Sequence, residues 1–425
     1  MYKAKLMSPH EAVRQIKSGD NIVLPIGAGE PPALMEALMG RAKELNDVVI
    51  HQMLSVRKWD YMKPEMAPHI RHNSWFISGV TRAGVNEGWI DFSPAHFSEI
   101  PALQAVQAPL DVVMAVVSPM DKHGYFTLGI SVDYTINACA KARRILVEVN
   151  PNMPRVMGSG HLHISEVSCV VENNAPIPEL PDPPISQTDA AIGRHIAELI
   201  EDGSTVQIGI GGMPNAVAKL LMEKKDLGIH TEMITNSIVD LVESGAVNGK
   251  KKTINPGKII GNFAYGTRRL YDFMDDNPSV ELHSVAYTNN PYVIGQNVKM
   301  VSINATLEVD LLGQCASESI GPKQFSGTGG QSDFVKGANL SPGGKSFIAL
   351  PSTAKDGQVS RIVPMLAQGA MVSTSKNDVD YVVTEFGAVR LRGKTARERA
   401  LSLISIAHPD FRNELKDAAR KMGLI

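Results

Sequence analysis

The order helix, apolar strand, glycine turn, helix occurs twice in this chain, and this internal repeat limits the folds open to it. The strand and the turn after it cover residues 21–26 and 27–32 in the first copy, and 205–208 and 209–214 in the second. Two pairs of glycines lie 184 residues apart, Gly19 with Gly203 and Gly27 with Gly211. A repeat of this kind predicts two similar α/β halves.

Helix-start signals precede both strands. The capping box from Ser8 to Glu11, with proline at the first helical position, predicts a helix that runs to about Lys17. In the second copy we expect a helix from Ser186 or Asp189 to about Ile200. Further helical patterns follow the two turns, so each strand is expected to lie between helices.

A second pair of segments repeats in the same order. Residues 167–172 resemble residues 379–385, since both are valine-rich runs that end in glutamate. We therefore predict two homologous domains, residues 1–175 and 186–425. The proline-rich segment 176–185 between them is expected to be a stiff, extended linker.

Short β-branched and apolar runs punctuate both halves and predict further strands: 48–50, 112–117, 144–149, 259–260, 298–301 and 346–350. Continuous apolar strands that alternate with helices are typical of open, mostly parallel sheets covered on both faces. Ligands of such sheets bind beyond the carboxyl ends of the strands. The two glycine turns are therefore the places to search for a site.

Composition excludes several classes of function. The chain has 425 residues, 43% of them hydrophobic, and a formal charge of −2, so nucleic acid is not an expected partner. No apolar run is long enough to cross a membrane and no signal-peptide pattern occurs, which predicts a cytoplasmic protein. The cysteines are expected to be small buried side chains: Cys139, Cys169 and Cys315. His161 and His163 have no third ligand in evidence, so no metal site is predicted.

Two glycine-rich segments can bring backbone N–H groups close to a ligand. The turn 209–214 is suited to an anion, but it lacks the third glycine of a dinucleotide fingerprint, and a tight strand–helix connection is an equally good interpretation. The segment 326–334 precedes a helical pattern that begins near Val335. Its N–H groups could face a developing oxyanion, although alone it is no more than a flexible loop.

Glu232 is the candidate nucleophile, one helix length after the second turn. A carboxylate is the group needed to attack a thioester, but a single loop glutamate is usually only solvated. His230 is more often a packing residue than a base. Three further polar side chains are candidates: Glu385, Asn289 and Asn290.

Several segments taken together resemble the family I coenzyme A transferases of the acetyl-CoA hydrolase/transferase group, in particular the branch that acts on 4-hydroxybutyrate or butyrate. The resemblance covers nearly the whole chain. It rests on five segments of the second half, 209–217, 230–233, 287–291, 327–334 and 382–387, with 118–126 and 147–150 in the first half.

The resemblance implies a fold and a set of roles. The fold is two homologous open α/β domains of the CoA-transferase type, and Glu232, which matches the family's Thr-Glu segment, is the nucleophile. Oxyanion contacts are expected from Gly329 and Gly330, with help from Asn289 or Asn290 and a supporting role for Glu385. The acyl and pantetheine pocket is expected to include Gly211, Gly212, Met213, Pro214 and Gly327. Gln331-Ser332 departs from the Ser-Gly of some relatives, which leaves the N–H donors open.

These roles predict an enzyme that exchanges CoA between a short-chain acyl-CoA and acetate, with ping-pong kinetics. No tightly bound cofactor is expected, since CoA is the substrate, and the resemblance implies a homodimer or homotetramer. One alternative is an acyl-CoA hydrolase on the same scaffold. Others are a nucleotide-binding oxidoreductase, which the missing third glycine disfavours, and a non-enzymatic binding module.

Overall fold

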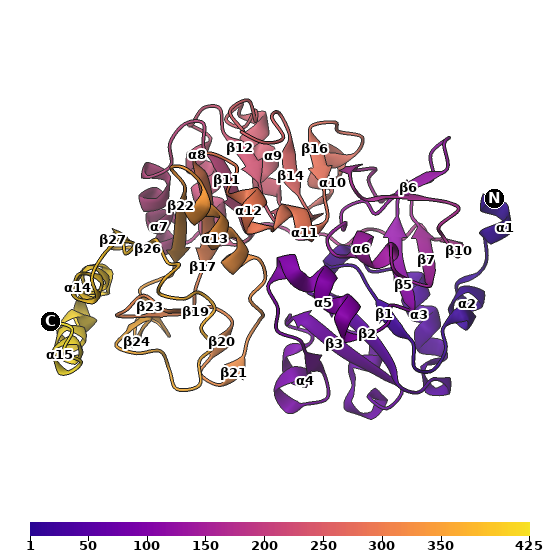
Figure 1. Cartoon of the computed structure of the whole chain (residues 1–425), viewed down its shortest axis with the longest axis horizontal. Coiled ribbons are helices and arrows are strands. Elements are labelled where there is room, and N and C mark those ends of the chain that lie inside the picture. Colours follow the sequence, from indigo (N-terminus) through magenta and orange to yellow (C-terminus); the bar gives the residue numbers. More distant parts are fainter. The chain divides into compact units, whose positions relative to one another are not determined.

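The computed structural model describes residues 1–425 and divides into two compact units (Figure 1). Unit 1 contains Met1–Pro181, Glu232–Ile234 and Ile260–Thr288; unit 2 contains Asp182–Thr231, Thr235–Ile259 and Asn289–Ile425. The chain therefore passes between the units at several points, one of them between Thr231 and Glu232. The domain boundaries and linker expected from the sequence stay a prediction.

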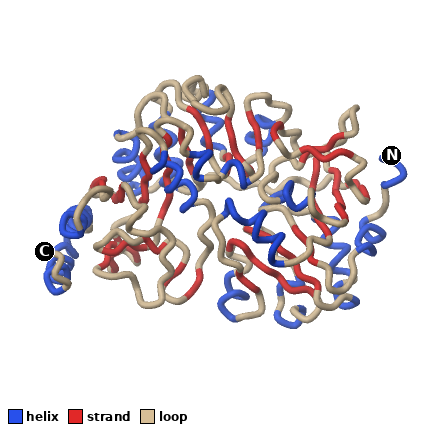
Figure 2. The backbone as a smooth tube through the Cα atoms, viewed as in Figure 1, coloured by secondary structure: helices blue, strands red, loops and turns tan.

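Unit 1 is built on a seven-stranded sheet whose paired strands are all parallel. Strands are coloured red in Figure 2. Across the sheet the strands are β10 (Cys169–Glu172), β7 (Arg144–Val149), β5 (Val112–Val117), β1 (Asn21–Val23), β2 (Val48–Met53), β3 (Ile70–Phe76) and β4 (Asp91–Phe92). Every residue of β5 is buried, as expected for a central parallel strand covered on both faces.

Unit 2 contains a second run of paired strands. In order they are β27 (Gly387–Arg390), β26 (Tyr381–Thr384), β22 (Lys345–Ala349), β17 (Met300–Ala305), β11 (Thr205–Ile208) and β12 (Gly228–His230). All neighbours are parallel except β27, which pairs antiparallel with β26 at the edge.

The internal repeat predicted from the sequence is confirmed by strand order. The run β10-β7-β5-β1-β2 of unit 1 has the same order as β26-β22-β17-β11-β12 of unit 2. The repeated valine-rich segments form β10 and β26, and each lies beside the corresponding strand, β7 or β22. Gly19 and Gly203, one pair at the repeat offset, both have a left-handed φ, +80° and +76°.

The remaining elements surround or extend these sheets. The helices are α1 (Tyr2–Lys5), α2 (Pro9–Ala12), α3 (Pro32–Gly40), α4 (Arg82–Glu87), α5 (Ile100–Gln107), α6 (Thr135–Cys139), α7 (Gln187–Glu198), α8 (Gly212–Leu221), α9 (Asn236–Glu243), α10 (Arg268–Met274), α11 (Val285–Thr288), α12 (Pro291–Ile294), α13 (Gln331–Leu340), α14 (Ala396–Ile406) and α15 (Arg412–Lys421). The short strands are β6 (Tyr125–Thr127), β8 (Met157–Gly158), β9 (His161–His163), β13 (Met233–Ile234), β14 (Ile259–Gly261), β15 (Phe263–Ala264), β16 (Val280–Leu282), β18 (Glu308–Asp310), β19 (Cys315–Ala316), β20 (Ser319–Ile320), β21 (Lys323–Gln324), β23 (Thr353–Ala354), β24 (Val359–Ser360) and β25 (Ile362–Val363).

Local boundaries depart from the sequence prediction where proline or a side chain intervenes. Strand β1 ends at Val23 rather than residue 26, since Pro25 has no N–H to donate to a ladder. The first predicted helix does not reach Lys17, because α2 tightens into a 3-10 turn from Val13 to Gln15 whose carbonyl at Val13 accepts from Arg41. The turn predicted over 209–214 is shorter, because α8 already begins at Gly212.

Helix caps, cysteines and the apolar character of the helices can each be compared with the sequence. The capping box predicted from Ser8 to Glu11 is present at the start of α2, and α7 begins with a second capping box, formed by Ser186 and Asp189. All three cysteines are free and buried, as expected. None of the helices combines the length and the apolar character that crossing a bilayer requires.

Candidate active site

A pocket of about 290 Å³ lies at the carboxyl ends of strands β11, β17 and β22 in unit 2. Its walls are residues that follow these strands or face them: Asp189, Ile192, Ile210, Gly211, Gly212, Met213, Pro214, Ala305, Thr306, Leu307, Ser317, Ala349, Leu350, Pro351 and Arg361. The strand order reverses direction between β11 and β17, which is where open α/β sheets bind ligands. Four residues predicted to bind substrate, Gly211 to Pro214, thus line one pocket.

Both glycine-rich segments lead into helices that lack a side-chain cap. Gly211 precedes α8 and Gly330 precedes α13, and at neither helix start does an N-cap side chain accept a backbone N–H. By contrast, helices α2, α7 and α14 each carry a complete capping box. A glycine N-cap leaves each helix start without a side chain that would compete with an anionic ligand group.

Close packing explains why glycine stands at position 212. A Cβ atom built there would lie 2.5 Å from Oδ2 of Asp189 and 3.1 Å from the carbonyl oxygen of Pro184. Oδ2 of Asp189 already accepts hydrogen bonds from the N–H and the hydroxyl of Ser186, at 3.0 and 2.6 Å. The Asp189 side chain therefore cannot move aside without breaking the cap of α7.

A hydrogen-bonded chain connects the second glycine segment with this pocket. Gln331 donates from Nε2 to the hydroxyl of Ser317 at 3.0 Å, and Ser317 donates to Oγ1 of Thr306 at 2.9 Å. Both Ser317 and Thr306 line the pocket. Helix α13 starts at Gln331, earlier than the predicted Val335, and Gly329 before it has φ +56°. Gln331 thus connects the start of α13 to the pocket wall. Gly327 is buried but does not line the pocket.

Glu232 is the one residue of segment 227–239 that is not buried. Thr231 before it is fully buried and donates its hydroxyl to the carbonyl of Ile208 at 3.4 Å. Ile208 is the last residue of β11 and directly precedes the glycine turn. This bond joins the residue before Glu232 to the strand end from which the glycine turn starts.

The backbone of Glu232 is fixed within unit 1. Its carbonyl accepts the N–H groups of Asn262 and Phe263, at 3.0 and 3.3 Å, and β13 pairs with β15 in the next residues. The carbonyl of Asn262 in turn accepts the N–H groups of Val132 and Asp133. The glutamate side chain therefore starts from a backbone position that unit 1 holds in place.

The other predicted polar residues have distinct surroundings. His230 is buried with its ring edge-on to Phe334, at a centroid distance of 6.3 Å, which agrees with a packing residue. Asn289 is buried, whereas Asn290 caps α12 by accepting the N–H of Tyr292 at 2.9 Å. All three belong to unit 2.

Glu385 is hydrogen-bonded to a residue beside the pocket wall. Its carboxylate accepts the N–H of Ser352 at 2.9 Å and the hydroxyl of the same residue at 2.6 Å. Ser352 follows Pro351, which lines the pocket. A carboxylate used in this way positions the segment after β22, and the contact agrees with a supporting rather than a nucleophilic part.

Arg361 is the pocket residue that sequence reasoning missed. It stands between β24 and β25, far along the chain from either glycine segment, and only the fold brings it to the pocket. No motif surrounds Arg361, so the sequence does not distinguish it from an ordinary surface arginine in a loop. Asp189 is predicted only as one of two possible helix starts, and its contact with the glycine turn does not follow from the sequence.

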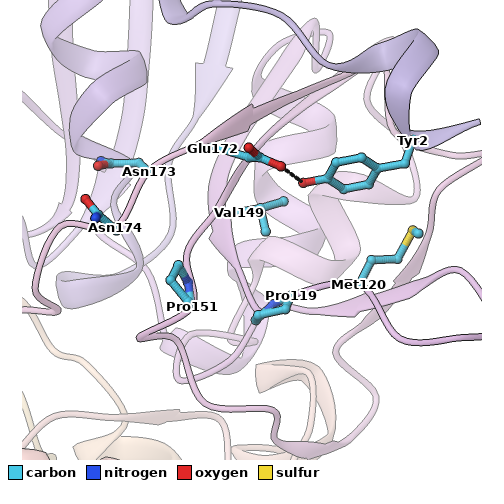
Figure 3. A pocket seen from close by; sticks show the side chains of 8 residues that line it. All are labelled: Tyr2, Pro119, Met120, Val149, Pro151, Glu172, Asn173 and Asn174. Atoms are coloured by element: carbon cyan, nitrogen blue, oxygen red, sulfur yellow. Dashed lines mark hydrogen bonds between the residues drawn. The ribbon is translucent and has the colours of Figure 1, made fainter.

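A second pocket, about 710 Å³, lies in unit 1 and contains none of the predicted site residues (Figure 3). It is lined by Tyr2, Pro119, Met120, Val149, Pro151, Glu172, Asn173 and Asn174. The Tyr2 hydroxyl points to Glu172 and donates to it at 2.8 Å (Figure 3). Nowhere in the chain do three or more histidine, cysteine or acidic side chains gather as metal ligands would.

Unit 1 also holds a buried carboxyl group, Glu30, after its own glycine turn. The Glu30 carboxylate accepts from Nε2 of Gln52 at 2.8 Å and from Nε1 of Trp59 at 2.7 Å. The Arg57 guanidinium is 4.0 Å away. Burial raises the pKa of Glu30 to about 7, and the hydrogen bonds and Arg57 offset only part of this increase.

This shift predicts a pH-dependent stability. Since the folded-state pKa of Glu30 is raised, its contribution is fully present below its ordinary pKa and is lost as the pH rises through about 7. We expect the Glu30 share of the unfolding free energy to fall between its ordinary pKa of 4.5 and its folded-state pKa of about 7, by up to about 1.4 kcal/mol per pH unit. Urea unfolding of Glu30→Gln should show a flatter pH profile than the wild type, whereas Glu36→Gln on the exposed face of α3 should not. Parallel profiles for Glu30→Gln and wild type would contradict the shift.

Comparison with known proteins gives consistent matches over the whole chain. The pattern of the acetyl-CoA hydrolase/transferase N-terminal domain matches residues 1–181, and that of the C-terminal domain matches residues 266–419. A succinyl-CoA:cyclohexane-1-carboxylate CoA transferase of Geobacter metallireducens is 55% identical over 100% of this chain and 97% of its own length.

A 4-hydroxybutyrate coenzyme A transferase of Clostridium kluyveri is 48% identical over 99% of this chain and 98% of its own length. Among solved structures, a 4-hydroxybutyrate CoA-transferase from Porphyromonas gingivalis superposes with a TM-score of 0.86. That structure is 40% identical and the match covers 99% of this chain and 98% of that one.

Proposed function

The chain belongs to the acetyl-CoA hydrolase/transferase family, and we propose that it moves CoA from a short-chain acyl-CoA to acetate through a thioester on Glu232. It is a CoA-transferase of the mixed α/β, mostly parallel type. One observation carries the proposed role of Glu232: it is the sole residue of segment 227–239 that is not buried, on a backbone held by two hydrogen bonds.

The reaction we propose conserves the energy of the thioester. The Glu232 carboxylate attacks the carbonyl of the acyl-CoA, which forms a mixed anhydride and releases CoA as thiolate. The thiolate attacks the glutamyl carbonyl, forms a glutamyl-CoA thioester and releases the first carboxylic acid as its carboxylate. Acetate then attacks the glutamyl-CoA carbonyl to give a second anhydride and thiolate. Attack of this thiolate on the acetyl carbonyl yields acetyl-CoA and restores Glu232.

We assign the surrounding groups to binding and charge stabilisation. The oxyanion formed at each attack would receive N–H groups of Gly329 and Gly330, and the absence of a side-chain cap on α13 supports this part of the proposal. An amide from Asn289 or Asn290 would assist. Gly211 to Pro214, which line the pocket, would bind part of the CoA chain. Gly327 does not line this pocket, and its approach to CoA is proposed from the resemblance alone. Glu385 would hold the pocket edge through Ser352.

The substrates we propose are 4-hydroxybutyryl-CoA or butyryl-CoA as donor and acetate as acceptor. Relatives with 48–55% identity carry transferase names that include 4-hydroxybutyrate, succinyl-CoA and cyclohexane-1-carboxylate, so the acyl group varies within this range of similarity. We further propose a cytoplasmic enzyme that works as a homodimer or homotetramer.

An acetate-dependence assay tests transfer against hydrolysis. With butyryl-CoA alone, we expect little release of free CoA, because water does not resolve the intermediate in a transferase. Addition of acetate should produce acetyl-CoA in an amount equal to the butyryl-CoA consumed. Steady release of CoA without any carboxylic acid would instead establish the alternative, an acyl-CoA hydrolase.

A further inference from the structure

The guanidinium of Arg361 lies in the wall of the unit 2 pocket without a partner. No hydrogen bond or ion pair joins its side chain to the protein, and its Nε atom is buried with no acceptor. Two other arginines of the same unit have acceptors: Arg390 pairs with Asp380 at 2.8 Å, and Arg399 donates to backbone carbonyls. An arginine Nε buried without an acceptor is costly, so it points to an acceptor supplied by a ligand.

The backbone of Arg361 is held on both sides. Its N–H donates to the carbonyl of Ser352 at 2.9 Å, and its carbonyl accepts the N–H of Val309 at 2.9 Å. Ser352 is itself bound by the Glu385 carboxylate. The guanidinium therefore projects from a fixed point of the pocket, which limits the entropy lost when it binds a ligand.

The pocket contains one carboxylate, Asp189, and this group already accepts hydrogen bonds from the protein. Asp189 accepts two hydrogen bonds from Ser186 as part of the capping box of α7, and no ion pair joins it to Arg361. The other pocket walls are glycine, apolar and hydroxyl side chains. The charge of Arg361 is therefore not neutralised within the pocket.

We propose that Arg361 binds an oxyanion group of the acyl-CoA substrate, an inference that rests on the proposed function. Two groups have the required chemistry: a phosphate of CoA, or the far carboxylate of a dicarboxylic acyl group. Both present paired oxygens to the forked N–H groups of a guanidinium. In either case Arg361 is a substrate-binding residue that selects for negative charge at this position.

The test uses Arg361→Gln, which removes the charge, and Arg361→Lys, which keeps it. Arg420→Gln on α15 is the matched control, since Arg420 is exposed and pairs only with its neighbour Asp417. Calorimetry with CoA and with pantetheine, which has no phosphate, measures binding without catalysis. Steady-state rates with succinyl-CoA and butyryl-CoA measure selection between charged and neutral acyl groups.

If the anion is a phosphate, Arg361→Gln should weaken CoA binding about ten- to hundredfold, Arg361→Lys less, and pantetheine binding should not change. If it is a carboxylate, CoA binding should persist while KM for succinyl-CoA rises by a similar factor and that for butyryl-CoA does not. The proposal fails if Arg361→Gln and Arg361→Lys change neither CoA affinity nor the succinyl to butyryl preference. A wild-type protein that does not bind CoA would instead refute the proposed function.

Discussion

Glu232→Gln should lose at least about 10³-fold in kcat for CoA exchange while it still folds and binds CoA. Glutamine occupies the same volume and keeps the backbone bonds to Asn262 and Phe263, so stability should change little. Its amide is not a nucleophile and cannot form the anhydride. No base or water can replace this step, because the thioester energy passes through the enzyme's own carboxyl group.

The control for this substitution is Glu223→Gln, which makes the same chemical change at an exposed position after α8. Its exchange rate should match the wild type. Initial-rate kinetics with butyryl-CoA and acetate, together with circular dichroism for folding, give the comparison. Exchange by Glu232→Gln within tenfold of the wild-type rate would exclude Glu232 as nucleophile, whatever other residue took its place.

Gly212→Ala should impair CoA binding strongly, whereas Gly209→Ala in the same segment should be tolerated. The added methyl group at position 212 would meet Asp189 Oδ2 at 2.5 Å and the Pro184 carbonyl at 3.1 Å, while no atom lies within 4 Å of the corresponding position at Gly209. Neither glycine has the left-handed φ that Gly211 requires. The pair therefore separates crowding from the general cost of replacing a glycine.

The expected magnitude follows from the cost of overpacking, about 1–3 kcal/mol. Expressed fully in substrate binding, this is a rise in KM for the acyl-CoA of about five- to 160-fold, because α8 must shift away from α7 and distort the pocket. Thermal unfolding should show a lower Tm for Gly212→Ala. For Gly209→Ala, Tm should fall by no more than the propensity effect. Equal KM values for the two variants would show that the Gly212 contact with Asp189 does not shape the site.

Much of the fold could be predicted because the chain repeats itself. The strand of β11 was predicted with its observed bounds, and the matching segments at 167–172 and 379–385 became the corresponding strands β10 and β26. The predicted bounds are wrong at the ends of strands and helices, where a single side chain determines whether the element continues. Periodicity does not reveal that Pro214 fits within the first turn of α8, and so the glycine turn was predicted too long.

The site was partly predictable for a different reason. Glycine-rich segments indicate where the backbone can approach a ligand closely, and Gly211 to Pro214 do line a pocket. Arg361 could not be found, because it reaches that pocket through strand pairing rather than through any local pattern. The contacts of Gln331 with Ser317 likewise depend on residues distant in sequence. The catalytic roles themselves came from resemblance and stay predictions.

Chemical trapping tests the central claim, that Glu232 carries CoA as a thioester. The enzyme is incubated with butyryl-CoA in the absence of acetate and then treated with borohydride, which reduces a glutamyl thioester to an alcohol. We predict that the peptide containing residue 232 loses the mass difference between a carboxyl and a hydroxymethyl group, and that acetate added before borohydride prevents it. An active enzyme whose Glu232 peptide keeps its mass after this treatment would contradict the account.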